Sequence, residues 1–448
     1  LIDSLLRRPE FADFWALKWS DLLRNEEKAL DPKGVRVLHR WVRASFAAGK
    51  PLNEFARELI AGLGSTYANP PANFYRALRD PYSRSEAVAQ VFLGVRLQCT
   101  RCHNHPFDRW KRQEYHEFAA FFGRIGYRVL ENNRKDDLDK HEFDGEQVVY
   151  IDRAAGLKHP DTGERLQPRF LGAPTPGLGG RDGELQALAD WVADPANPFF
   201  ARAQVNRIWY HLTGRGLVEP NDDFRASNPP SNGPLLDHLT REFVASNFDV
   251  RHVIRLIMNS RTYQLSAVPN ETNAEDEAHF SRAYVRPLQA EQLLDALAQV
   301  LGVPVEFQGY PVGTRAGEIA APRFPSRRAP RGPGEKFLKA FGQPDRLLSC
   351  DCERSNDAGL VQAFQLLTGE LLHDMLRRPD NRIGKSIADG LTDAEIVRRL
   401  YLAALCREPT PAEESGIRQF LERSPDRRAA LEDVAWGVLN AKEFLLRR

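Results

Sequence analysis

The chain has 448 residues, 42% of them hydrophobic and 27% charged, and this length predicts two or three domains with well-formed cores. Its 62 lysines and arginines nearly balance its 61 acidic residues, so the net charge of +1 gives no sign of a nucleic-acid partner. No apolar run is long enough to span a bilayer, and we expect no membrane span within the chain. Because the sequence begins Leu1-Ile2-Asp3, we expect any export signal to lie upstream.

The first part of the chain, up to about Gly123, has a helical pattern. Apolar residues recur at helical spacing around Trp15 and Trp19, and the stripe that these residues form with Trp41 is typical of a core. An apolar helix is expected over 85–97 and a second helix over 112–122. These two helices would enclose the polar segment between them.

A small β insertion is predicted at about residues 145–172. It contains a short strand at 148–151, a tight turn from His159 to Glu164 and a second strand through Phe170. The proline- and glycine-rich residues 173–183 then form a predicted interdomain linker. The expected domains are therefore 1–172 and 184–448.

The remaining chain is again predicted to be helical. Helices are expected at 185–192, 199–213, 235–246, 250–260, 289–301, 358–376, 392–405, 412–422 and 428–444. Residues 303–344 are rich in proline, glycine and arginine, which favours a long irregular loop. The polar groups of Asn206, Arg207, Asp222, Asp223 and Arg261 could form interdomain salt bridges or a polar site, and the structural role is favoured. The predicted fold class is mainly α, with two helical domains, one small β insertion and this loop.

The segment with the most specific chemistry is Cys99-Thr100-Arg101-Cys102-His103. C-x-x-C-H is the spacing of covalent c-type haem attachment, because two thiols one helical turn apart can reach both vinyl groups of one porphyrin. His103 would then offer its imidazole to the iron. We expect His105 to lie beside this ligand, oriented by Asp108.

The same residues allow other sites. Cys99 and Cys102 could form a disulfide or, with His103 and His105, a zinc or non-haem iron site. Cys350 and Cys352 form the second group of thiols, and we expect them to lie close to the first group. They would pair with each other, cross-link the two domains, bind a shared metal, or face a haem together with Glu353 and Arg354. Cys406, within an apolar helix, is predicted to be a buried core thiol.

Several motifs in chain order resemble a known domain pair. The chain is similar to the domains of unknown function of planctomycetes and related bacteria, in which a cytochrome-c-like domain of the PSCyt type precedes its PSD partner. The PSCyt-like motifs are FADFWALKWSDLLR at 11–24 and FLGVRLQCTRCHNHPFD at 92–108, and the PSD-like motifs are FARAQVNRIW at 200–209, GRGLV at 214–218, DDFR at 222–225, SRTYQ at 260–264, CDCER at 350–354 and LNAKEFL at 439–445. The resemblance implies an exported, periplasmic or cell-surface protein, often with a further cytochrome domain upstream, and it implies no particular reaction.

Two functions follow as hypotheses. In the first, the chain is an exported redox protein that carries one haem c at Cys99, Cys102 and His103 and exchanges electrons with an upstream cytochrome domain or another redox partner. In the second, it is a binding or scaffold module stabilised by a non-haem metal or by disulfides, in which the cysteine pairs join the two domains.

Overall fold

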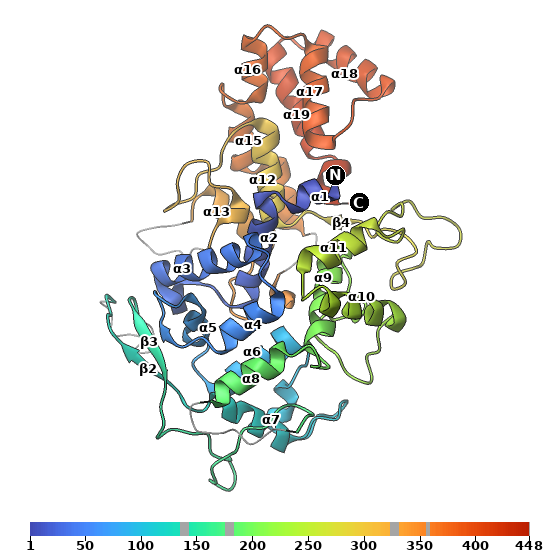
Figure 1. Cartoon of the computed structure of the whole chain (residues 1–448). Helices are drawn as coiled ribbons and strands as arrows, with labels where there is room; N and C mark the ends of the chain where they lie inside the picture. Colours follow the sequence, from blue (N-terminus) through green and yellow to red (C-terminus); the bar gives the residue numbers. More distant parts are fainter. Residues whose placement is uncertain (135–142, 175–182, 323–330, 355–358, 448) are drawn as a thin grey trace. The chain divides into compact units, whose positions relative to one another are not determined.

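The computed structural model describes residues 1–134, 143–174, 183–322, 331–354 and 359–447 (Figure 1). It is 54% helical and 5% strand, with two small sheets, so the predicted mainly α class is confirmed. Within the described parts, no helix combines the length and the apolar character needed to cross a membrane.

The chain forms two compact units. Unit 1 contains Leu1–Tyr284 and Arg346–Glu353, and unit 2 contains Val285–Asp345 and Arg354–Arg448. The short segment 346–353 therefore belongs to unit 1 although the chain on both sides of it belongs to unit 2. The predicted linker at 173–183 falls mostly outside the described residues, and the boundary there stays a prediction.

Unit 1 is built from amphipathic helices whose aromatic residues meet in its core. Trp19 of α2 is 2% exposed and packs against Phe55 of α4 and Phe92. Trp15, also on α2, is buried and stacks on Phe46 of α3, as a core stripe predicts. The helices of this unit are α1 (Ile2–Leu6), α2 (Pro9–Leu22), α3 (Glu27–Ala47), α4 (Leu52–Ile60), α5 (Asn73–Ala77), α6 (Pro81–Val88), α7 (Arg112–Ala119), α8 (Glu184–Ala193), α9 (Phe200–Thr213), α10 (Gly233–Ala245) and α11 (Val250–Asn259).

The predicted helix at 85–97 begins and ends four residues earlier than expected, over 81–93. It continues from α6 as a π-helix, η2 (Ala89–Leu93), and ends at Gly94, whose φ of 67° lies in the left-handed region. A side chain at this position would collide with its surroundings, because a Cβ on Gly94 would lie 2.8 Å from Cδ2 of Phe224. The close approach also lets the Phe224 backbone N–H donate to the Gly94 carbonyl at 2.9 Å.

The β structure of unit 1 is a three-stranded antiparallel sheet in the order β1-β3-β2. Its strands are β1 (Gly64–Ser65), β2 (Ile125–Val129) and β3 (Gln147–Ile151), and Tyr127 pairs with Val149. β3 confirms the predicted strand at 148–151. The predicted second strand through Phe170 is wrong, because only an isolated bridge between Lys158 and Arg165 forms there, around the predicted turn. Both strands that pair with β3, β1 and β2, precede the expected insertion.

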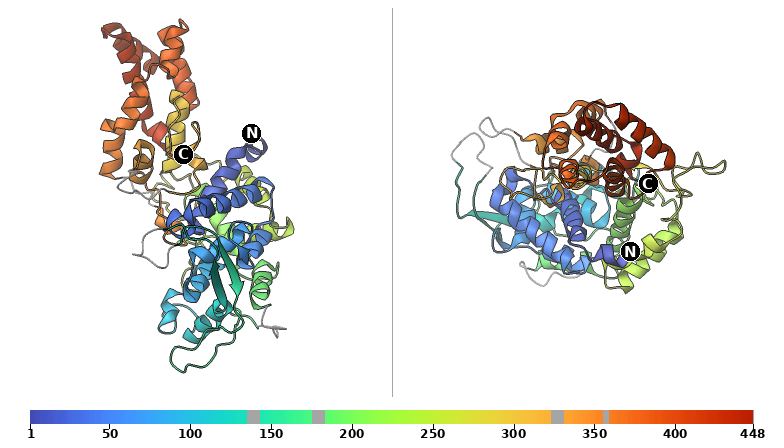
Figure 2. Two further views of the ribbon diagram at one scale, coloured as in Figure 1. Left: turned by 90° about the vertical axis from the view of Figure 1, so that its left-hand side faces the viewer. Right: turned by 90° about the horizontal axis from the view of Figure 1, so that it is seen from above.

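Unit 2 has its own core around α12 (Ala290–Leu301). Leu294, Leu297 and Leu301 are at most 1% exposed there and pack with residues of the later helices. Helices α17, α18 and α19 lie side by side (Figure 2). The other elements of this unit are β4 (Arg286–Pro287), α13 (Pro333–Ala340), α14 (Leu360–Thr368), α15 (Glu370–Arg377), α16 (Arg382–Ala388), α17 (Asp393–Leu405), α18 (Pro411–Arg423), α19 (Arg427–Leu439), α20 (Lys442–Leu445) and β5 (Leu446–Arg447). Among its described residues, the predicted loop at 303–344 contains a 3-10 turn, η5 (Ala316–Glu318), and the helix α13, which begins at a proline suited to a first helical turn.

The prediction that Cys406 is a buried core thiol is wrong. Cys406 is exposed and free rather than buried, because it caps α17 in a left-handed conformation with φ of 55°, which turns the chain away from the helix axis.

Candidate functional site

The C-x-x-C-H segment lies on a short 3-10 turn of unit 1, η3 (Gln98–Arg101). Thr100 fixes this turn, since its side chain is fully buried and its backbone N–H donates to the Leu97 carbonyl at 2.8 Å. Cys99 and Cys102, on either side of Thr100, are both exposed and carry free thiols. The turn therefore presents the two thiols to solvent from an anchored backbone.

Hydrogen bonds give His103 and His105 opposite tautomers. Nδ1 of His103 lies 2.7 Å from the carbonyl oxygen of Asn104, and a carbonyl only accepts, so Nδ1 carries the proton and the Nε2 lone pair is available. Nδ1 of His105 instead accepts from the backbone N–H of Phe107 at 3.2 Å, so a neutral His105 carries its proton on Nε2. Of the two histidines, His103 is arranged as a ligand through Nε2.

Asn104 connects this arrangement to the helix that follows. Its side-chain oxygen accepts from the backbone N–H of Arg112, the first residue of α7, at 3.0 Å. The His105 backbone N–H donates to the carbonyl of Trp110, which is 3% exposed. Asp108 accepts from the backbone N–H of Arg109 at 2.8 Å. The loop that holds both histidines is thus closed by its own polar contacts.

Exposed arginines and one exposed aromatic ring surround the turn. The guanidinium of Arg101 lies 5.0 Å from the ring centre of Tyr82, and that of Arg109 lies 4.6 Å from Trp110. Phe107 is 68% exposed. In the part of the chain that the structure describes, no three His, Cys, Asp or Glu side chains converge as a metal site.

The second cysteine pair closes on itself in the segment 346–353. Cys350 and Cys352 form a disulfide with 5.2 Å between their Cα atoms, which is one of the pairings that the sequence left open. Cys350 is 5% exposed, whereas Cys352 faces solvent. A disulfide sulfur is not a thiolate ligand, so a metal at these two cysteines stays a prediction for the reduced pair only.

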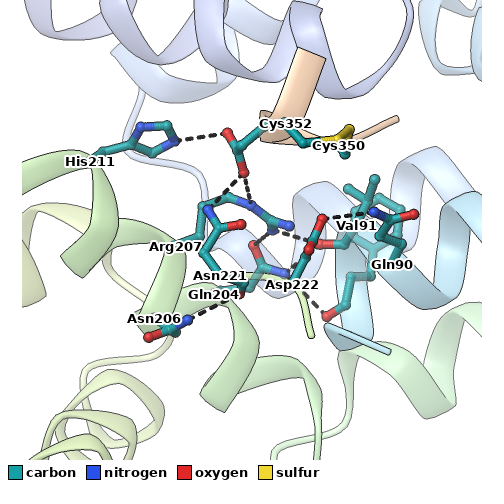
Figure 3. A network of polar contacts seen from close by, with 12 residues as sticks. Gln90, Val91, Gln204, Asn206, Arg207, His211, Asn221, Asp222, Cys350 and Cys352 are labelled. Atoms are coloured by element: carbon teal, nitrogen blue, oxygen red, sulfur yellow. Dashed lines mark hydrogen bonds and ion pairs between the residues drawn. A yellow bond between two sulfur atoms is a disulfide. The ribbon is translucent and has the colours of Figure 1, made fainter. Parts of the chain in front are cut away.

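Asp351, between the two cysteines, reaches into a buried polar network. Figure 3 shows Arg207, Asn221 and His211 of this network near the Cys350–Cys352 disulfide. Its carboxylate accepts from Nε of Arg207 at 3.1 Å and from Nδ2 of Asn221 at 3.0 Å. Nε2 of His211 faces the same carboxylate at 3.4 Å, longer than an ordinary hydrogen bond. The Arg207 side chain is 3% exposed, and the Asp351 side chain is 11% exposed. Asp351 is therefore the counter-charge of a buried guanidinium.

The surroundings keep Asp351 ionised. Burial alone would raise the pKa of the carboxyl group, but the contacts with His211, Arg207 and Asn221 outweigh burial and hold the pKa well below its ordinary value. Burial is also the largest influence on His211, and it lowers the pKa of that imidazole. We infer that an ionised Asp351 and an uncharged His211 face each other at neutral pH.

Hydrogen bonds extend this network to the C-x-x-C-H turn. Nη1 of Arg207 donates to the Val91 carbonyl at 2.6 Å. Next to Val91, the side-chain amide of Gln90 donates to Asp222 at 2.7 Å and accepts from Gln98 at 2.9 Å. Gln98 directly precedes Cys99.

Family models match both parts of the chain. The PSCyt2 model, described as a protein of unknown function (DUF1549), matches residues 1–127, and the PSD1 model, described as a protein of unknown function (DUF1553), matches residues 185–421, which is more than half of the chain. The chain belongs to the PSD1 family. The predicted resemblance and the order of the two domains are confirmed. No curated protein and no solved structure gave a significant match.

The polar network joins the PSCyt2 region to the PSD1 region. Gln90, Val91 and Gln98 belong to the former, and Arg207, Asp222 and Asp351 to the latter. The sequence showed Arg207 and Asp222 as candidate salt-bridge residues. It could not show that Asp351 is the partner of Arg207, because 144 positions separate them.

The two remaining site candidates have separate roles. Glu353 closes the cysteine segment by accepting from the backbone N–H groups of Leu347 at 3.0 Å and Leu348 at 2.9 Å. Arg354 belongs to unit 2, where it pairs with Glu291 at 2.6 Å. Neither contact involves the C-x-x-C-H turn.

Proposed function

We propose that the chain is an exported redox protein that carries one covalent c-type haem at Cys99, Cys102 and His103. The observation that supports this most is the tautomer of His103. An iron ligand needs an unprotonated Nε2, and metal-bound histidines usually donate their other N–H to a carbonyl or carboxylate, as Nδ1 of His103 does to the Asn104 carbonyl.

The residues of the turn fit the attachment chemistry. Both thiols are free and exposed, so each can add to a porphyrin vinyl group, and the bound haem would supply one-electron iron chemistry. A zinc or non-haem iron site held by the protein alone fits less well, since among the described side chains no three such ligands converge. The exposed setting of the turn, beside Phe107, is suited to electron exchange with an upstream cytochrome domain or another redox partner.

The scaffold function is the second candidate, and one observation favours it. The segment that carries the Cys350–Cys352 disulfide also carries Arg346, which pairs with Asp21, so its polar contacts join PSD1 and PSCyt2 residues. In this case Cys99 and Cys102 would bind a non-haem metal or remain thiols.

Haem attachment can be tested directly. The whole chain is exported in a bacterial host that has periplasmic haem-attachment machinery, and the purified protein is examined by absorbance, by haem staining after denaturation and by mass spectrometry. We expect a Soret band and a mass increase of one haem. The variant Cys99→Ser/Cys102→Ser should lose both, whereas Cys406→Ser, which removes the other free and exposed thiol, should keep both. A colourless wild-type protein with stoichiometric zinc or iron would refute the proposal and favour the scaffold function.

A further inference from the structure

The Cys350–Cys352 disulfide is poorly explained as a structural cross-link. A disulfide stabilises a fold mainly by closing a loop in the unfolded chain, and the effect grows with loop length. Here the two cysteines are only two positions apart, so the bridge restricts almost no chain beyond Asp351 itself. Its main structural effect is on the conformation of the residue between the cysteines.

That residue is the one that enters the buried network. The Asp351 carboxylate neutralises Arg207 and accepts from Asn221. A change in the backbone around Asp351 would withdraw a counter-charge from a guanidinium whose side chain is only 3% exposed, and an uncompensated buried charge is strongly unfavourable. The oxidation state of the two sulfur atoms is thereby coupled to the ionic contacts inside unit 1.

The segment is held at both ends independently of the bridge. Arg346, 1% exposed, donates from Nε to Asp21 at 2.8 Å and from Nη1 to the Asn25 carbonyl at 2.9 Å. At the other end, Glu353 binds the backbone N–H groups of Leu347 and Leu348. Opening the bridge would therefore leave both ends in place, which is what a reversible reaction requires.

The two sulfur atoms also differ in access. Cys352 is exposed and Cys350 is 5% exposed, so an incoming thiolate can reach only the sulfur of Cys352, and Cys350 is the leaving group. Leu347 and Leu348, which are 48% and 55% exposed, give the same segment an exposed apolar surface.

We propose that Cys350–Cys352 is a reversible thiol–disulfide site that accepts two electrons from a dithiol and thereby controls the contacts of Asp351. One thiolate of the dithiol attacks Sγ of Cys352, and the Cys350 thiolate leaves and takes up a proton. The second thiol of the reductant, as its thiolate, then attacks the reductant's first sulfur in the mixed disulfide. This releases the Cys352 thiolate, which takes up a proton. Two electrons and two protons pass to the chain, and the dithiol becomes a disulfide.

The reduced site would affect the C-x-x-C-H turn through residues already described. Arg207 holds the Val91 carbonyl, and neighbouring Gln90 holds Gln98, the residue before Cys99. Loss of the Asp351 contact would loosen the Val91 to Gln98 backbone. The sulfur atoms of Cys350 and Cys352 take no part in haem attachment, so this site is independent of the proposed haem.

The test uses the full chain with Cys99→Ser, Cys102→Ser and Cys406→Ser, so that only the bridge can titrate. The protein is equilibrated without denaturant in buffers of reduced and oxidised dithiothreitol, the thiols are trapped with a maleimide, and their modification is quantified by mass spectrometry. We expect the same midpoint on reduction and reoxidation, unchanged helical circular dichroism, and modification of Cys352 before Cys350. In the reduced form, amide exchange should accelerate at least tenfold at 349–352 and at 91–98 but not in α17.

Two further variants separate a redox site from a static bridge. Asp351→Asn should lower about tenfold the ratio of reduced to oxidised dithiothreitol at which half of the bridge is open. The reason is that the substitution weakens the contacts that favour the disulfide-bonded form. Ser349→Ala alters a neighbour whose hydroxyl has no hydrogen-bond partner among the described residues, and it should leave the midpoint unchanged. A bridge that opens only where the chain unfolds, a reduction that abolishes the circular dichroism signal, or equal midpoints for Asp351→Asn and its parent would each refute the proposal.

Discussion

Arg346 and Asp21 are 325 positions apart in the chain, yet they form a buried ion pair with 2.8 Å between Nε and Oδ1. Their side chains are 1% and 10% exposed. Asp21 lies in the PSCyt2 region and Arg346 in the PSD1 region, so one charge from each family domain depends on the other.

Removing one partner of this pair should destabilise unit 1 strongly. Arg346→Met keeps the volume of the side chain but leaves the Asp21 carboxylate buried without its cation, and we expect a loss of about 3–5 kcal/mol in the free energy of unfolding. Arg378→Met breaks an exposed, solvent-screened pair with Asp380 and should change the stability far less. Urea denaturation followed by circular dichroism measures both, and similar losses would contradict a buried pair.

The histidine tautomers can be measured without haem. Nitrogen-15 chemical shifts of the haem-free protein above pH 8 should show the proton of His103 on Nδ1 and that of His105 on Nε2, because the first faces a carbonyl and the second a backbone N–H. Substitution of each histidine in turn by glutamine assigns the signals. The same tautomer in both rings would remove the main support for His103 as the iron ligand.

The number of reactive thiols follows from the cysteine chemistry. The native protein without haem should react with a thiol reagent at Cys99, Cys102 and Cys406, which are free and exposed. Cys350 and Cys352 should react only after reduction. Peptide mapping distinguishes the five positions, and a native protein whose reactive set includes Cys350 would contradict the assigned pairing.

Asp295 of α12 should make the stability of unit 2 depend on pH. Burial raises the pKa of this carboxyl group to about 6, although two backbone N–H groups partly oppose the shift. Since the folded pKa lies above the unfolded value, the favourable contribution is complete below about pH 4 and is lost as the pH rises through about 6. The loss by pH 7 is about 2–3 kcal/mol.

Asp295→Asn imitates the protonated group and supplies the control for this titration. Its stability relative to wild type should rise between pH 4 and pH 7, because only the wild type ionises a buried carboxyl group. Denaturant midpoints at several pH values give the comparison. Parallel pH profiles of the two proteins would show that Asp295 is not the titrating group.

Gly94 should tolerate no side chain. Alanine there combines a left-handed backbone with a Cβ that lies 2.8 Å from Phe224 and 3.0 Å from Ala203, and we expect a loss of about 2–4 kcal/mol. Gly163 has a similar φ of +71° but nothing within 4 Å of its Cβ position, so Gly163→Ala should show only the backbone cost of about 1 kcal/mol. Equal losses in thermal unfolding would mean that the contact with Phe224 is unimportant.

The sequence predicted the long amphipathic helices well, because their spacing reflects burial of one face. The predicted helix at 250–260, for example, is α11 (Val250–Asn259). The sequence pattern did not predict α13 and α16, which are short and lie among prolines and glycines. Strand pairing was predicted less well, since β3 has a clear apolar run whereas its partner β2 is half exposed.

At the candidate site, too, the sequence revealed local patterns but not contacts between distant positions. The spacing of Cys99, Cys102 and His103 is local, and the sequence alone identified it. The Arg207–Asp351 contact joins distant positions, and no pattern in one sequence encodes which buried cation a given carboxylate will meet. Cys406 was misjudged because a single left-handed residue, rather than the apolar run before it, decides where that thiol points.

The membership of segment 346–353 in unit 1 limits how this protein can be divided by gene fragmentation. A fragment ending at Tyr284 would keep Asp21 and Arg207 but lose Arg346 and Asp351. Asp21 would then lack the Arg346 cation, and Arg207 would lack the Asp351 carboxylate. The complementary fragment would carry these two charged residues with no interior to receive them. The larger fragment would thus lack two of its buried counter-charges, and supplying the eight-residue piece as a separate peptide should stabilise it.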